Sequence, residues 1–343
     1  MSVDKKSSLY RKLMVLLVSL IGLSANTNAQ NKVYPSEITV DKSGKGNYKT
    51  IQEAVNSVRD LGEKEVKIFI KNGTYNEKVI IPSWKTKIYL IGESKESTII
   101  TFDDYSGKKV PFGKDAFALD KFSTYTSYTF LVQANDVFLE NLTIINASGR
   151  VGQAVALHVE GDRFIAKNCK FSGNQDTLFA ATENSRQFYL NCFIEGTTDF
   201  IFGKATAVFE SCTIKSLTNS YITAAATSAN QQFGFVFITC KLIGAEGVNK
   251  VYLGRPWRPF AKTVFIKSDL GNHVIPEGWN PWIGDSMFPD KEKTAFYAEY
   301  QNTGQSAGVK NRVGWAKQLT DKEAKLYSVK NILKGADNWN PSK

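Results

Sequence analysis

Histidine is scarce in this 343-residue sequence, which contains only His158 and His273. Neither lies in a GxSxG nucleophile elbow or at a metal-ligand spacing, and no glycine-rich phosphate loop follows a strand-like segment. The four cysteines lack the CxxC spacing that zinc sites use. These absences argue against a Ser-His-Asp hydrolase, a phosphate-loop enzyme and a zinc protein, and they favour structural or surface roles for both histidines.

Long apolar runs are also scarce, and the one that stands out is LMVLLVSLIGL near the N-terminus. It is shorter than the roughly 20 residues that span a bilayer. Four basic residues precede it and small and polar residues follow it up to Ala29, which is typical of a secretory signal peptide. We therefore expect cleavage near Ala29, a signal peptide at 1–29 and one domain at 30–343, secreted or periplasmic and without a membrane anchor.

The net charge of the chain is +10, and losing residues 1–29, with four basic residues and one acid, would leave +7. A basic exported protein suits an anionic partner such as nucleic acid, anionic lipid or an acidic polysaccharide. No Lys/Arg run of five residues and no nucleic-acid-binding motif occurs. We therefore expect no nucleic-acid partner, and charge by itself does not choose among the others.

A short pattern recurs around the cysteines, as KNCKF, LNCFI, ESCTI and ITCKL. ENLTI and IKSDL match it without cysteine, and the steps from Leu142 to Ser268 are 27, 23, 20, 28 and 28 residues. Each copy alternates in the manner of a β-strand, and no helix-length segment separates the copies, which argues against βαβ units. This repeat predicts an all-β solenoid, specifically a right-handed, single-stranded parallel β-helix.

The register of such a stack predicts what lies inside it and what closes it. The cysteines would form a ladder of small apolar side chains, an interpretation we favour over disulfides, which neighbouring coils would still permit. Asn141, Asn168 and Asn191 would form a second ladder. A capping box in TIQEAVNSV predicts a short helix closing the N-terminal end, and residues 321–335 could form a helix along the stack.

Two acidic residues occupy equivalent places in successive copies. Asp176 follows Cys169 by seven residues, and Asp199 follows Cys192 by seven. Equivalent Cα atoms on neighbouring parallel strands lie about 4.8 Å apart, so the two carboxylates would be stacked. Like charges at that separation raise one pKa, which gives a general acid beside a base or nucleophile. The alternative is a pair of solvated turn residues, but the apolar neighbours, Phe179 among them, argue against it.

The segment YLGRPWRPF supplies two further candidates in the loop region after the last cysteine. The guanidinium of Arg255 would keep Asp199 ionised and oriented. Trp257 offers a flat face on which a sugar ring can stack. An Arg-Pro-Trp string alone is more often a structural turn, so its meaning depends on the two acids.

Longer motifs in the chain resemble those of the pectin methylesterases. They are GNYKTIQEAV (46–55), GQAVALHVEGD (152–162), FSGNQDTLFA (171–180), GTTDFIFGKATAVFESC (196–212), YLGRPWRPFAKTVF (252–265) and IPEGWNPW (275–282). The resemblance covers nearly all of residues 30–343. It implies a parallel β-helix enzyme that hydrolyses the methyl ester of galacturonate units in pectin, releasing methanol, without a cofactor or metal.

The resemblance also implies catalytic roles. Asp199 takes the place of the nucleophile, and Asp176 that of the general acid that later activates water as a base. Gln175 resembles the donor that stabilises the oxyanion, while Gln153 assists it or contacts substrate. Arg255 orients the nucleophile.

Substrate contacts follow from the same resemblance. Trp257 and Phe202 would bind sugar, and Thr124 is similar to a substrate-contacting threonine. The partner would be methyl-esterified homogalacturonan, acted on by a monomer. The stretch YITAAATS (221–228) departs from the plant sequences of the family.

Two other functions remain open at this point. Carboxylates about 5 Å apart also suit a retaining glycosidase, so a β-helix glycosidase or lyase acting on polygalacturonate is one alternative. A carbohydrate-binding or adhesive solenoid is the other, and it would need no nucleophile. Methanol with unchanged chain length would support the esterase, new reducing or unsaturated ends would support the glycosidase or lyase, and a function unaffected by Asp199→Asn would support the binding solenoid.

Overall fold

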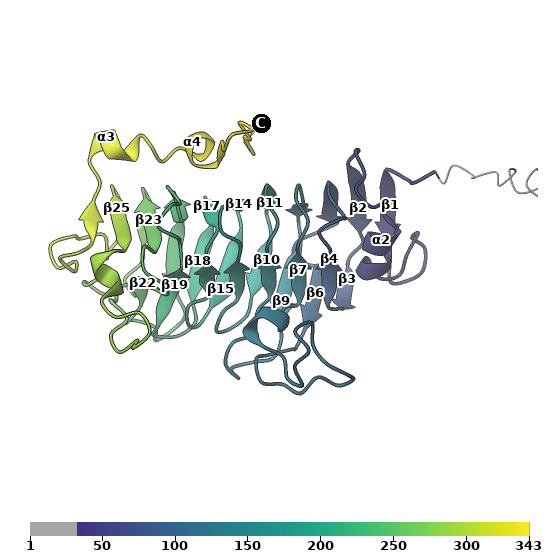
Figure 1. The fold of residues 1–343 in the computed structure, drawn as a ribbon, viewed down its shortest axis with the longest axis horizontal. Helices are drawn as coiled ribbons and strands as arrows, with labels where there is room; N and C mark the ends of the chain where they lie inside the picture. Colours follow the sequence, from purple (N-terminus) through teal and green to yellow (C-terminus); the bar gives the residue numbers. More distant parts are fainter. Residues whose placement is uncertain (1–32, 343) are drawn as a thin grey trace, which may run out of the picture. The chain divides into compact units, whose positions relative to one another are not determined.

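The computed structural model describes residues 33–342, and the segment Pro35–Lys343 forms one compact unit. The predicted signal peptide at 1–29 lies outside the described residues. Within the unit, strands β1 to β26 form three sheets, and every strand pair in them is parallel. From β2 to β24 the chain visits the three sheets in turn, so that each complete coil contributes one strand to each sheet. Figure 1 shows the coils stacked side by side in chain order.

The 11-stranded sheet runs through the whole stack. Its inward-facing positions carry large apolar side chains, and its outer face supports the C-terminal segment. In spatial order its strands are β1 (Glu37–Val40), β2 (Val66–Ile70), β5 (Ile88–Gly92), β8 (Phe138–Glu140), β11 (Phe164–Lys167), β14 (Arg186–Leu190), β17 (Thr206–Glu210), β20 (Phe235–Ile238), β23 (Lys262–Ile266), β25 (Phe296–Tyr300) and β26 (Lys317–Gln318).

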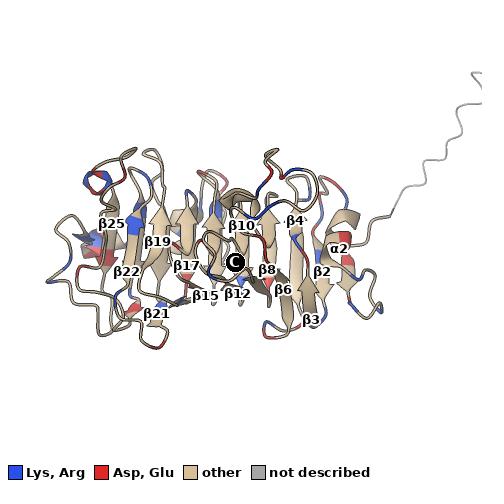
Figure 2. Ribbon diagram, turned by 90° about the horizontal axis from the view of Figure 1, so that it is seen from below, with Lys and Arg blue, Asp and Glu red and all other residues tan. Residues whose placement is uncertain are grey.

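The other two sheets complete each coil. The 8-stranded sheet contains β3 (Gly73–Asn76), β6 (Thr98–Phe102), β9 (Thr143–Asn146), β12 (Lys170–Ser172), β15 (Phe193–Gly196), β18 (Thr213–Ser216), β21 (Lys241–Gly244) and β24 (Asp269–Leu270). The 7-stranded sheet contains β4 (Val79–Ile81), β7 (Phe130–Val132), β10 (Leu157–Val159), β13 (Leu178–Ala180), β16 (Ile201–Gly203), β19 (Tyr221–Ala225) and β22 (Tyr252–Pro256). In Figure 2, charged residues of both signs are spread along the stack, mainly in turns and loops and at strand ends.

The cysteine ladder lies inside the stack as predicted. Cys169, Cys192, Cys212 and Cys240 are all free and almost fully buried. Each follows a strand of the 11-stranded sheet and precedes a strand of the 8-stranded sheet. A buried free cysteine behaves as a small apolar residue, so these four side chains form part of the core.

The asparagine ladder marks the bend that precedes the cysteines. Asn141, Asn168 and Asn191 have φ angles of 54°, 49° and 53°, in the left-handed region. Asparagine tolerates that region better than most residues with a Cβ atom. The Nδ2 group of Asn168 donates a 2.6 Å hydrogen bond to Oδ1 of Asn141. A backbone requirement of the bend therefore explains the recurring asparagine.

A short helix covers the N-terminal end of the core. α2 (Ile51–Ser57) begins at Thr50, whose side chain accepts a hydrogen bond from the backbone of Glu53 while the Glu53 side chain accepts one from Thr50, completing the predicted capping box. Ile51, Ala54 and Val55 are the buried residues of this helix, which packs against β1, β2 and β4. The predicted capping helix is therefore present.

The C-terminal segment contains two short helices where the sequence suggested one. α3 (Asp321–Ala324) and α4 (Val329–Leu333) lie along the outside of the 11-stranded sheet, across the top of Figure 1. Leu333 packs in an apolar cluster with Val208 of β17. Two 3-10 turns, η1 (Thr124–Thr126) and η2 (Lys291–Lys293), lie in loops between coils. No helix within residues 33–342 has the length and apolarity needed to cross a membrane.

Replacing Phe209 with alanine tests the core of the stack. Phe209 is fully buried and stacks between Tyr189 and Phe237, with ring centroids 4.7 Å and 4.5 Å away. Because the cavity cannot close within rigid coils, Phe209→Ala should lower the free energy of unfolding by about 3–5 kcal/mol in urea titrations. Phe112→Ala is the control, since Phe112 is 92% exposed. Equal effects of the two changes would contradict this description of the core.

Candidate active site

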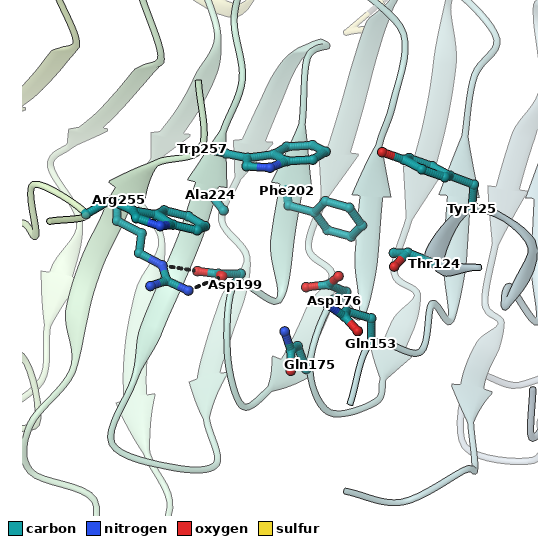
Figure 3. A pocket seen from close by; sticks show the side chains of 11 residues that line it. Thr124, Tyr125, Gln153, Gln175, Asp176, Asp199, Phe202, Ala224, Arg255 and Trp257 are labelled. Carbon is teal, nitrogen blue, oxygen red and sulfur yellow. Dashed lines mark hydrogen bonds and ion pairs between the residues drawn. The ribbon is translucent and has the colours of Figure 1, made fainter. Parts of the chain in front are cut away.

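A pocket of about 220 Å³ opens on the outer face of the 7-stranded sheet (Figure 3). All eight residues singled out from the sequence line this pocket, although they come from five separate loops and strands. They are Thr124, Gln153, Gln175, Asp176, Asp199, Phe202, Arg255 and Trp257. The pocket thus brings together every candidate residue, over a distance of more than 130 positions in the chain.

One row of outward-facing residues runs across the 7-stranded sheet beneath the pocket and beside it. Strand pairing places Phe179 of β13 next to Phe202 of β16, then Ala224 of β19 and Arg255 of β22. Their neighbours along each strand, such as Ile201, point inward and belong to the main core. Alternation along short strands therefore explains why this row faces outward.

The two acids lie in the turns that lead into β13 and β16. Because Leu178 pairs with Ile201, the residues two positions earlier, Asp176 and Asp199, are in register on successive coils. Their φ angles are 68° and 50°, and the backbone N–H of Asp199 donates to the carbonyl of Tyr221 on the next coil. Asp176 is only 8% exposed and Asp199 only 5% exposed, so the alternative of solvated turn residues is wrong.

Asp199 is held by a two-pronged ion pair. Nε of Arg255 donates to Oδ1 at 3.0 Å, and Nη2 donates to Oδ2 at 2.6 Å (Figure 3). Burial raises the pKa of Asp199 above its usual value, and the hydrogen bonds and charge of Arg255, together with the charge of Lys291, oppose that rise. The paired guanidinium makes Asp199 the carboxyl group of the two that ionises first.

Asp176 has no such partner. Among residues 33–342, no hydrogen bond or ion pair to its carboxyl group is formed. Burial raises its pKa well above the usual range, the negative charge of Asp199 raises it further, and Arg255 opposes the rise. The pKa of Asp176 is therefore raised more than that of Asp199, so Asp176 keeps its proton to higher pH than Asp199 does.

Two amide side chains border the carboxyl groups. Gln153 and Gln175 are joined by a parallel β-bridge, and the N–H of Ala154 donates to the carbonyl of Gln175. In Figure 3, Gln175 lies on the opposite side of the carboxyl groups from Trp257 and Phe202. Amide N–H donors and aromatic faces thus occupy different walls of the pocket.

Aromatic side chains form the other wall. Phe202 stacks on Phe179 with centroids 4.4 Å apart and planes 5° from parallel, and it meets the edge of Trp257 at 5.8 Å. Tyr125, from the 3-10 turn that also contains Thr124, covers Phe179 at 5.7 Å. An apolar platform beside two carboxyl groups can hold a sugar ring above reactive oxygens.

Three lining residues were not singled out from the sequence: Tyr125, Ala224 and Trp282. Trp282 lies in the quoted motif IPEGWNPW, and Tyr125 is adjacent to Thr124. Both therefore lie in or next to a segment that the family resemblance had already indicated. Ala224 belongs to YITAAATS, the stretch that departs from the plant pattern. Tyr125 and Trp282 lie in loops outside the strand register, whereas Ala224 is in register with Phe202.

The histidines do not line the pocket. Burial lowers the pKa of His158 to about 3 and that of His273 to about 4, so both are neutral above those values. His158 packs against Phe179 with ring centroids 4.5 Å apart, which fits the structural role expected of it. Within the described part of the chain, no group of three His, Cys, Asp or Glu side chains could hold a metal ion.

Comparison with known proteins agrees with this geometry. A family model described as Pectinesterase matches residues 37–336. The chain belongs to the pectinesterase family. It is 39% identical over 310 residues to putative pectinesterase 11 of Arabidopsis thaliana, covering 89% of this chain and 81% of that protein. It is also 36% identical to putative pectinesterase/pectinesterase inhibitor 26 of the same plant, and this match covers 91% of this chain and 32% of that protein.

Solved pectin methylesterases share the fold. The carrot enzyme matches with a TM-score of 0.78 and 32% identity over 88% of this chain and 93% of that one. PemA from Erwinia chrysanthemi matches with a TM-score of 0.76 and 30% identity over 90% and 98%. A pectin methylesterase in complex with a hexasaccharide matches with a TM-score of 0.73 and 30% sequence identity, over 88% of this chain and 97% of that one. These matches confirm the predicted family and the parallel β-helix.

The raised pKa of Asp176 predicts a stability cost at neutral pH. An unfolded aspartate ionises near pH 4, whereas folded Asp176 holds its proton to higher pH. Stability is therefore lost as pH rises from about 4 toward the folded pKa. Asp176→Asn cannot ionise, so it should melt at a higher temperature than the unmodified protein at pH 8, with the difference vanishing below about pH 4.

The control for these melting curves is Glu246→Gln, at an exposed position outside the pocket. It should show no pH-dependent difference. A melting temperature for Asp176→Asn that is equal to or below that of the unmodified protein at pH 8 would contradict the assignment.

Proposed function

We propose that this pectinesterase hydrolyses the methyl esters of galacturonate units in pectin, with Asp199 as nucleophile and Asp176 as general acid and base. The observation that carries the proposal is the pair of buried carboxyl groups in register, one ion-paired to Arg255 and the other unpaired. Family membership and the solved pectin methylesterases support the same reaction. The neighbour that holds a hexasaccharide supports an oligosaccharide substrate.

In the first half of the reaction, an Oδ atom of Asp199 attacks the carbonyl carbon of the methyl ester. The resulting oxyanion collapses as the bond to the methoxy oxygen breaks. Asp176 gives its proton to that oxygen, so that methanol leaves and an acyl-aspartyl anhydride remains. Its raised pKa keeps Asp176 protonated for this step.

In the second half, water hydrolyses the anhydride. Asp176, now a carboxylate, accepts a proton from the water as its oxygen attacks the galacturonate carbonyl carbon. The acyl bond to Asp199 breaks and both carboxyl groups return to their starting states. Arg255 stabilises Asp199 as a leaving carboxylate through the same pair of hydrogen bonds that orients it for attack.

The remaining wall residues have separate roles in the proposal. Gln175, with Gln153 beside it, donates N–H groups to the oxyanion, because neither amide is committed to another side chain in the described part of the chain. Trp257 and Phe202 hold the sugar ring against the apolar platform. Thr124 lines the same pocket and contacts substrate.

We further propose that the enzyme works after export, as a monomer, on homogalacturonan. The signal-like segment at 1–29 supports export. The whole chain has a net charge of +10, and removal of residues 1–29 would leave +7. A positively charged enzyme suits a polymer that becomes more anionic with each ester cleaved.

Replacing either acid tests the chemistry. Asp199→Asn removes the nucleophile and Asp176→Asn the proton donor, so each should abolish methanol release from methylated pectin. The β-rich circular dichroism should not change, because neither side chain belongs to the main core. Chain ends are followed in the same assay. Methanol release retained in either variant would contradict the roles given to the two acids. New reducing or unsaturated ends formed by the unmodified protein would favour a depolymerase, and no release of methanol by the unmodified protein would favour a binding solenoid.

Gln175→Ala should lower kcat by about 10²–10³, the usual effect of losing one oxyanion donor. Initial rates of methanol release measure the change. The control is Gln305→Ala, at an exposed position outside the pocket, which should leave kcat unaltered. If Gln175→Ala keeps full turnover, the oxyanion role belongs to another donor.

A further inference from the structure

The guanidinium of Arg255 contacts two aromatic rings in addition to the carboxylate of Asp199. Its Cζ atom lies 3.9 Å from the ring centre of Tyr221 and 3.6 Å from that of Trp282. A guanidinium is flat, and its Nε–Nη2 edge is occupied by the carboxylate of Asp199. Two rings centred that close to one carbon must cover its two faces. Arg255 is therefore sandwiched between aromatic rings.

Tyr221 contacts both members of the ion pair. Its ring covers Arg255, and its carbonyl accepts a 2.9 Å hydrogen bond from the backbone N–H of Asp199. It is the first residue of β19, between the coil that carries Asp199 and the coil that carries Arg255. Tyr221 is absent from the lining of the pocket, so it acts on the pair without being placed to touch substrate.

The second ring is fastened by a buried ion pair. Nζ of Lys291 lies 4.4 Å from the ring centre of Trp282 and forms a 2.6 Å ion pair with Asp285. The Lys291 side chain is 0% exposed. A cation over an indole face is stabilising, and more so when desolvated. The loop that contains Lys291 thereby holds Trp282 against Arg255.

We propose that Tyr221 and Trp282 form a clamp of two positioning residues, which keeps the Arg255 guanidinium in the plane of the Asp199 carboxylate. This inference rests on the proposed function of Asp199 as nucleophile. A guanidinium free to rotate would make two hydrogen bonds only part of the time, whereas rings on both faces leave the in-plane arrangement as the one that avoids collision. The clamp therefore orients the nucleophile and favours its ionised form.

Among the described residues, four titratable or charged groups interact with Asp199 from the elements around it. They are Asp176 from the turn before β13, Arg255 from β22, Lys291 from η2 and Tyr297 from β25. If the Arg255 side chain is less restrained, its two hydrogen bonds to Asp199, the strongest direct contact among these groups, are weakened. The pKa of Asp199 should then rise, because the carboxylate loses its hydrogen-bonded cation while its burial is unchanged.

The test is Tyr221→Leu, which removes the ring but keeps the backbone carbonyl. We expect kcat for methanol release to fall roughly 10- to 100-fold, as for other misplaced catalytic groups, with little change in KM. The acidic limb of the pH profile of kcat/KM should move to higher pH. Tyr221→Phe keeps a ring over Arg255 and should restore both properties.

Tyr252→Leu is the matched control. Tyr252 pairs with Tyr221 on the next coil and stacks on it at 5.3 Å, and no contact with Arg255 or Asp199 is formed by its ring in the described chain. It should leave the acidic limb in place. An unshifted limb in Tyr221→Leu, or an equal shift in Tyr252→Leu, would overturn the clamp.

A measurement without substrate separates this inference from the proposed function. Carbon-13 NMR of the aspartate carboxyl groups, with Asp199 assigned by the loss of its signal in Asp199→Asn, follows its titration directly. A higher pKa in Tyr221→Leu than in Tyr252→Leu supports the clamp even if no methanol is released, in which case the esterase proposal alone fails. Equal titration of Asp199 in both variants overturns the clamp.

Discussion

The parallel register between neighbouring coils is the constraint on which the rest of this structure depends. Backbone hydrogen bonds pair Leu178 with Ile201, and the same register stacks Asp176 over Asp199. The separation of equivalent residues is set by the backbone, at about 4.8 Å, and not by the side chains themselves. Backbone hydrogen bonds consequently hold the two carboxyl groups close together, although negative charge on both at once would be unfavourable.

The two acids differ because their surroundings on that ladder differ. A later coil supplies Arg255 to Asp199, whereas no cation among residues 33–342 forms a hydrogen bond with Asp176. Burial penalises charge on both, so the guanidinium decides which one ionises. A nucleophile and a proton donor arise from the same residue type through position alone.

Much of the fold and the site could be predicted because a solenoid repeats. Cysteine spacing indicated the coils, and the same spacing put Asp176 and Asp199 in register. The motifs of the family located the other pocket residues. Tyr125 and Trp282 were missed because they lie in loops between coils, which follow no period. The tail was predicted as one helix, yet it folds as two, and Ser328 caps the second by accepting a hydrogen bond from the backbone of Asn331.

The sequence by itself determined the order of the coils, the interior place of the cysteines and the alignment of the two acids, because each depends on local alternation and constant spacing. Only the tertiary structure decided that both acids are buried, that Arg255 reaches Asp199 with two hydrogen bonds, and that aromatic rings enclose that arginine. Those outcomes depend on loops of unequal length meeting across several coils. Contacts of that kind form between residues far apart in the chain, and no local pattern encodes them.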